Sequence, residues 1–177
     1  MTVYTNTFQS PIGKIVLASN GTELTGLWFE GQKYFGSTLM PDYEPRDLPV
    51  FVDTFLWLET YFEGKDPGRI PVLALNGSPF RRAVWDILLS IPYGQTITYG
   101  EIARRLAKDR GLKTMSAQAV GGAVGHNPIS IIVPCHRVVG TSGSLTGYAG
   151  GIDKKVRLLE LEGVDTRCFS VPTKGTA

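Results

Sequence analysis

The sequence predicts a mixed α/β (α+β) protein of two domains. We expect a small N-terminal domain of β-meander and helix, followed by a C-terminal domain like a winged helix-turn-helix. Three observations support this: strand-like segments around an Asn20-Gly21 turn, a linker rich in proline and glycine from Gly64 to Pro79, and helix start signals after it. We therefore place the domains at residues 1–78 and 79–177.

The first domain opens with segments of strand-like composition. These are residues 2–8, 14–19 and 22–30, and Asn-Gly between the last two is typical of a β-hairpin turn. A loop rich in proline and acidic residues follows. Apolar residues at helical spacing then predict a helix from Val52 to Phe62 that ends before Gly64.

The second domain begins with three predicted helices. Ser78-Pro79 starts the first, because proline is favoured at the first helical position. Thr98 and Glu101 have capping-box spacing and start the second. The third runs from Ser116 to Gly125, after a connection longer than a simple helix-turn-helix needs.

The chain then returns to a strand and a last helix. The apolar run 129–139 predicts a strand, and the glycine-rich segment 140–151 predicts a loop. We expect the last helix to have Asp153 as its N-cap and to stop at Gly163.

Composition narrows the classes of function. The sequence shows neither a signal-peptide pattern nor an apolar run of about 20 residues, so we expect a cytoplasmic protein without a membrane partner. Cys135 and Cys168 lack the spacing of a zinc site, so we expect no metal. Residues 1–78 carry five Lys/Arg against nine Asp/Glu (net −4), and residues 79–177 carry thirteen against seven (net +6). This asymmetry indicates a polyanionic partner for the second domain.

Cys135 is the candidate nucleophile. By composition alone, a cysteine beside Ile132 and Val133 is a small core residue. However, Pro134 favours a strand end, and His136 and Arg137 bring positive charge that favours a thiolate. Neighbouring residues on a straight strand point to opposite faces, so the strand must end or twist there for Cys135 and His136 to cooperate.

The hexapeptide 134–139 (PCHRVV) resembles the active-site signature of the O6-alkylguanine-DNA alkyltransferases. Asn127-Pro128 precedes it and GYAGG (147–151) follows, and the resemblance extends over about residues 79–165. It implies direct-reversal DNA repair, in which the alkyl group of O6-alkylguanine moves to the protein's own cysteine in a single turnover without a cofactor. O4-alkylthymine is a second candidate substrate.

The resemblance also implies a catalytic set. Glu162 and His136, through a water molecule, deprotonate Cys135. Tyr99 donates a proton toward N3 of the departing guanine, and Asn127 holds the turn before the active-site strand.

The resemblance further implies a substrate pocket. The carbonyls of Cys135 and Val138 accept from the guanine amino group. The backbone around Tyr148 and Ala149 contacts O6 and walls the pocket.

The implied partner is double-stranded DNA, bound in the minor groove without sequence preference by a monomer that flips the damaged base out. The family usually has an arginine on the recognition helix where this chain has Gln118, which puts its DNA affinity and base flipping in question. The expected DNA-binding residues are Gln118, Ala119, Gly121, Gly122 and Arg137.

Two other classes of function stay open on the residues alone. One is a winged-helix damage sensor in which the cysteine is dispensable. The other is a thiol hydrolase using Cys135, His136 and Glu162, which needs an oxyanion hole and leaves the DNA-binding features without a role.

Overall fold

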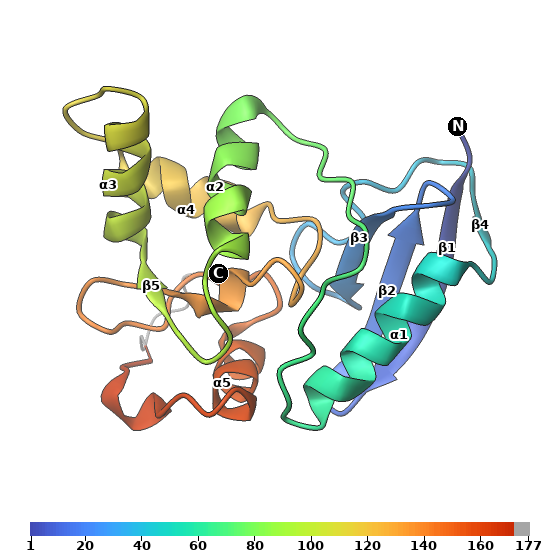
Figure 1. Cartoon of the computed structure of the whole chain (residues 1–177). Coiled ribbons are helices and arrows are strands. Elements are labelled where there is room, and N and C mark those ends of the chain that lie inside the picture. The colour runs from blue at the N-terminus through green and yellow to red at the C-terminus, as the bar shows by residue number, and fades with distance from the viewer. Residues whose placement is uncertain (172–177) are drawn as a thin grey trace. The chain divides into compact units, whose positions relative to one another are not determined.

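A computed structural model describes residues 1–171 and divides the chain into two compact units (Figure 1). The first comprises residues 1–76 together with 128–132, and the second comprises residues 77–127 and the chain from 133 onward. Strands dominate the first unit and helices the second, which confirms the predicted mixed α/β class.

The first unit is built on a four-stranded sheet. In chain order the strands are β1 (Val3–Ser10), β2 (Gly13–Ser19), β3 (Leu24–Phe29) and β4 (Tyr43–Pro45). Their order in the sheet is β3-β2-β1-β4, with antiparallel pairing except between β1 and β4. The Asn20 side chain accepts from the amides of Thr22 and Glu23, which closes the turn between β2 and β3. All three residues of β4 are exposed. A strand is predicted from alternating apolar and polar residues, and β4 has no such alternation, so the sequence could not predict it.

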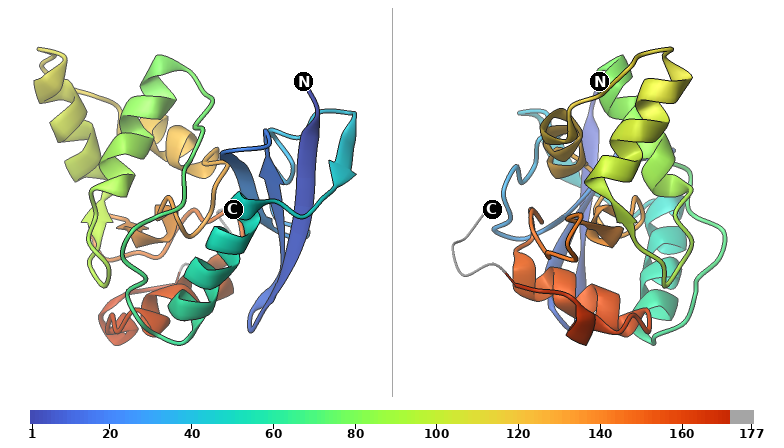
Figure 2. Two further views of the ribbon diagram at one scale, coloured as in Figure 1. Left: turned by 45° about the vertical axis from the view of Figure 1, so that its right-hand side comes forward. Right: turned by 90° about the vertical axis from the view of Figure 1, so that its left-hand side faces the viewer.

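One helix covers a face of this sheet (Figure 2). It is α1 (Pro49–Phe62), which begins three residues earlier than predicted. The ring of Phe8 on β1 stacks against Phe55 and Phe62 of the helix, with ring centroids 5.9 and 6.3 Å apart. Aromatic packing therefore holds α1 on the sheet.

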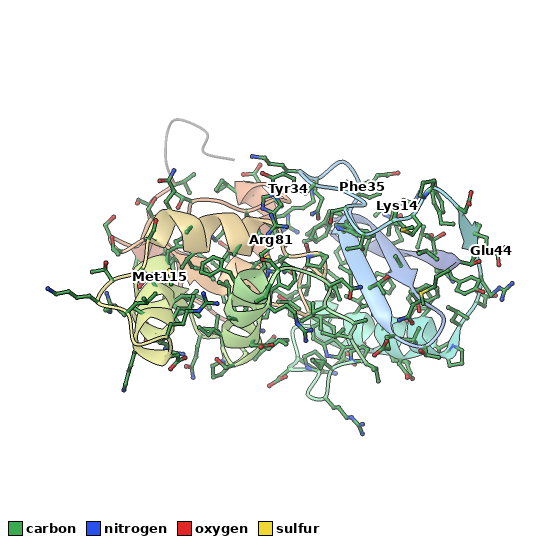
Figure 3. The ribbon with its side chains drawn as sticks, turned by 90° about the horizontal axis from the view of Figure 1, so that it is seen from above. Lys14, Tyr34, Phe35, Glu44, Arg81 and Met115 are labelled. Atoms are coloured by element: carbon green, nitrogen blue, oxygen red, sulfur yellow. The ribbon has the colours of Figure 1, made fainter. Side chains whose placement is uncertain are left out.

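Three helices form the first part of the second unit. They are α2 (Pro79–Leu89), α3 (Tyr99–Asp109) and α4 (Ala117–Gly125), in agreement with the predicted segments. Side-chain oxygens of Ser78, Thr98 and Ser116 cap their N-termini. Figure 3 labels Arg81 in the first turn of α2 and Met115 in the connection between α3 and α4. The indole of Trp85 donates to the carbonyl of Ala123 at 2.9 Å and thereby joins α2 to α4.

The predicted strand over 129–139 is wrong for most of its length. Only β6 (Val138–Val139) is a strand, and it pairs in parallel with β5 (Ile97–Thr98). Ile131 has a φ of 70°, and a 3-10 helix, η1, occupies Cys135–Arg137. The apolar residues are buried without alternation, so hydrophobicity alone could not distinguish tight turns from a strand here.

The chain ends its described part with α5 (Ile152–Leu161) and the 3-10 helix η2 (Thr166–Cys168). Gly151, not Asp153, is the N-cap of α5, because its φ of 97° makes the turn into the helix and places Asp153 within the first turn. Gly163, at φ 82°, ends the helix as predicted. Within residues 1–171, no helix is both long and apolar enough to cross a membrane.

Candidate active site

Consecutive tight turns position Cys135. Pro134 (φ −83°, ψ 64°) is the centre of an inverse γ-turn, in which the amide of Cys135 donates to the carbonyl of Val133 at 2.8 Å. The Asn127 side chain donates to the same carbonyl at 2.8 Å. Because Cys135 and His136 lie on a 3-10 helix, the alternation of a straight strand no longer forces their side chains to opposite faces.

His136 and Glu162 form a buried pair. His136 is completely buried, and its Nε2 is hydrogen-bonded to the Oε2 of Glu162. A carboxylate can only accept, so Nε2 carries the proton of a neutral imidazole and Nδ1 is the basic nitrogen. Nδ1 of His136 is therefore the ring nitrogen that can accept a proton.

Arg137 also contacts Glu162. Its Nε donates to Oε1 at 2.7 Å, and its Nη1 donates to the carbonyl of Ile91 at 2.7 Å. The amide of Gly94 donates to the same Oε1 at 2.9 Å. Arg137 is only 8% exposed, so the structure does not support the DNA contact expected of it: its guanidinium is directed to a buried carboxylate instead of the surface.

Burial and these partners set the charges. Burial would raise the pKa of Glu162, but His136 and Arg137 together lower it to about 2. Burial lowers the pKa of His136 despite the nearby carboxylate. Burial raises the pKa of the Cys135 thiol, although Asn127 and Lys155 oppose that effect. At rest, the site thus combines a thiol, a neutral imidazole and an ionised carboxylate.

Lys155 is a site residue that the sequence analysis missed. Its completely buried ammonium donates to the carbonyls of Val138 (2.5 Å) and Thr146 (2.8 Å), and burial lowers its pKa to about 8. Lys155 lies on the buried face of α5 with Leu158, Leu159 and Glu162. The spacing i, i+3, i+4 and i+7 was therefore the signal that could have found it.

Tyr99 forms hydrogen bonds to the backbone of the loop after β6. The Tyr99 hydroxyl donates to the carbonyls of Thr146 (3.0 Å) and Gly147 (3.3 Å), and burial raises its pKa. A Cβ at Gly147 would lie 3.1 Å from that hydroxyl, and φ is 70°, so both space and backbone require glycine. Of the expected pocket residues, Val138 and Tyr148 are buried, and Ala149 is partly exposed.

Helix α4 presents a small-residue face to solvent. Gln118, Ala119 and Gly122 are exposed, whereas Gly121 is partly buried. A Cβ at Gly122 would meet nothing within 4 Å, and one at Gly121 would only touch the ring of Tyr99 at 4.0 Å. Packing inside the chain therefore does not explain either glycine.

Comparisons with known proteins agree with this geometry. Residues 79–164 match the DNA-binding domain of 6-O-methylguanine DNA methyltransferase, and residues 3–70 match its ribonuclease-like domain. The chain belongs to the 6-O-methylguanine DNA methyltransferase family. This confirms the resemblance on which the sequence analysis relied.

Relatives match almost the whole chain. The methylated-DNA--protein-cysteine methyltransferase of Mycobacterium tuberculosis is 46% identical, covering 90% of this chain and 92% of the relative. That of Haemophilus influenzae is 40% identical, covering 90% and 86%. A crystal structure of Mycobacterium tuberculosis OGT in complex with DNA has a TM-score of 0.78 at 42% identity, covering 95% and 98%.

Proposed function

We propose that this protein repairs DNA by transferring the alkyl group of O6-alkylguanine to Cys135, once per molecule. The observation that carries the proposal is the placement of Cys135 directly before the buried His136–Glu162 pair, in a chain of this family. A thiol next to a neutral imidazole with a basic Nδ1 is suited to nucleophilic attack. The named relatives transfer methyl groups from DNA to a protein cysteine, which supports the same activity here.

In the reaction that we propose, the Cys135 sulfur displaces guanine from the alkyl carbon. The Cys135 thiol gives its proton to Nδ1 of His136 through a water molecule, and Glu162 stabilises the imidazolium that forms. The thiolate attacks the alkyl carbon, so an S–C bond forms and the C–O6 bond breaks. The electron pair of the C–O6 bond stays on guanine, which takes up a proton from solvent, and the His136 imidazolium returns the thiol proton to solvent. The resulting thioether is a poor leaving group, so each molecule reacts once.

In this scheme Tyr99 donates a hydrogen bond to the departing guanine and does not transfer its proton to it. Because burial raises the pKa of its hydroxyl, Tyr99 holds its proton firmly. We propose that it donates a hydrogen bond to the leaving guanine after its single hydroxyl hydrogen has left the carbonyls of Thr146 and Gly147. Asn127 keeps the turn at Val133 closed, and the backbone at Tyr148 and Ala149 walls the pocket.

DNA binding by the second unit completes the proposal. The complex with DNA of a relative that matches almost the whole chain supports DNA binding. We propose that the exposed face of α4, with Gln118, Ala119, Gly121 and Gly122, approaches the minor groove of alkylated DNA and that the protein acts as a monomer. The small residues permit a close approach of the helix backbone.

The direct test is nucleoside analysis of a duplex that contains O6-methylguanine, after incubation with excess protein. We expect O6-methylguanine to be replaced by guanine with the wild type and with Cys168→Ser, but not with Cys135→Ser. Tight binding without any guanine recovery would favour a damage sensor instead, and hydrolysis of a thiol-sensitive ester at many turnovers would favour the hydrolase.

A further inference from the structure

We propose that Arg137 is a positioning residue: together with the Gly94 amide it occupies Oε1 of Glu162, so that Oε2 serves His136 and the carboxylate stays ionised while Cys135 loses its proton. The inference rests on the proposed function and extends it to how the base of the reaction is held.

The two oxygens of the Glu162 carboxylate accept hydrogen bonds from different groups. Oε2 is bonded to His136, and Oε1 receives Arg137 Nε at 2.7 Å and Gly94 N at 2.9 Å. Two donors from different segments fix the rotation of the carboxylate about its last bond. Arg137 itself is fixed by its second bond to Ile91, at 2.7 Å.

The same contacts determine which residue holds the proton that leaves the Cys135 thiol. An imidazolium at His136 could pass its Nε2 proton to Glu162 if that carboxylate were an isolated buried anion. The guanidinium on Oε1 compensates the negative charge, so the proton stays on His136 and the pair remains imidazolium and carboxylate.

Other charged groups act on this pair. Besides Arg137 beside it in η1, Lys155 of α5 acts on the charge of His136. Tyr93 of the turn before β5 donates to the carbonyl of Leu161, next to Glu162. Lys155 bonds to the carbonyls of Val138 and Thr146, whereas Arg137 bonds to the carboxylate itself. Removal of Arg137 therefore acts directly on Glu162.

The test measures the reactivity of Cys135 toward iodoacetamide from pH 5 to pH 10, without DNA. All variants carry Cys168→Ser, which leaves Cys135 as the single cysteine. We expect Arg137→Met to move the midpoint of reactivity upward by about one pH unit, which is about a tenfold loss of rate below the midpoint. Arg137→Lys should restore part of the shift. The matched control is Arg105→Met, which removes an exposed ion pair with Glu101 and should leave the midpoint unchanged.

A double-mutant cycle separates positioning from a general structural role. In a Glu162→Gln background, Arg137→Met should move the midpoint of Cys135 reactivity no further. The effect of Arg137 depends on the Glu162 carboxylate, which this background lacks. Thermal unfolding identifies the folded variants, and if Arg137→Met does not fold, Arg137→Lys is compared with the wild type in both backgrounds. An unchanged midpoint in folded Arg137 variants, or shifts that add in full with Glu162→Gln, would overturn the proposal. Methyl transfer from damaged DNA to the wild type is measured in parallel. If the Arg137 variants show the expected midpoint shifts but the wild type accepts no methyl group, only the proposed function is contradicted.

Discussion

At the scale of single residues, the chemistry of Cys135 depends on how a buried thiol becomes a thiolate. Burial raises its pKa, and the side chain of Asn127, the charge of Lys155 and two backbone amides lower it. The resting cysteine is therefore a thiol, and in the mechanism that we propose His136 is the base that deprotonates it. Such a nucleophile reacts slowly with adventitious reagents near neutral pH, because only a small part of it is thiolate.

Glu162 gives the first prediction at this scale. The pKa of its carboxyl is about 2 in the folded protein against an ordinary value of 4.5. A lowered folded pKa contributes stability that is present above about pH 4.5 and is lost as the pH falls through about 2. The contribution is at most roughly 3 kcal/mol. We expect the free energy of unfolding of the wild type to fall more steeply below pH 4.5 than that of Glu162→Gln, as measured by urea denaturation; parallel acid slopes would contradict this.

The sequence predicted part of the site at this scale. Cys135, His136 and Glu162 came from the signature and its resemblance, and the structure joins His136 to Glu162. Gly94 could not be foreseen, because it contributes only a backbone amide from a turn 68 residues before Glu162. Arg137 was assigned to DNA because the sequence does not say whether a cation beside a cysteine faces solvent or a buried carboxylate.

At the scale of elements, local signals were reliable where they had a local cause. Thr98 and Ser78 cap their helices because the acceptor and its donor lie three residues apart. The apolar run at 129–139 failed as a strand because its turns depend on contacts from elsewhere. The amide of Ser130, for example, donates to the carbonyl of Leu27 at 2.9 Å.

Helix α4 provides a prediction for an element. Gly122 lies inside the helix with open space at its Cβ position, so Gly122→Ala should stabilise the helix by about 1 kcal/mol. If the exposed face approaches DNA closely, the added methyl should nevertheless weaken duplex binding several-fold. Thermal unfolding and fluorescence anisotropy with a labelled duplex measure the two effects.

The control is Gly125→Ala, in the last turn of the same helix, where a Cβ also meets nothing within 4 Å. We expect it to bind DNA like the wild type. Equal DNA affinity for both alanine variants would argue against close approach at Gly122.

At the scale of the whole molecule, charge and chemistry belong to the same part of the chain. The net charge is −4 over residues 1–78 and +6 over residues 79–177, and Cys135, His136 and Glu162 all belong to the second unit. An electropositive unit that carries Cys135, the acceptor that we propose, suits a substrate presented on a polyanion. The sequence thus predicts that the chemistry belongs to residues 79–177. It could not predict that residues 128–132 join the first unit, because that depends on pairing between residues about 100 positions apart, such as Leu27 and Ile129.

We propose that each molecule accepts one alkyl group, on Cys135. Intact-protein mass spectrometry after mixing with excess duplex containing O6-methylguanine tests it most directly, with peptide mapping to locate the added mass. We predict a gain of one methylene unit on Cys135 that saturates at one per protein and is absent in Cys135→Ser. An unchanged mass in a protein that still binds the damaged duplex, or a modification on Cys168, would contradict transfer to Cys135.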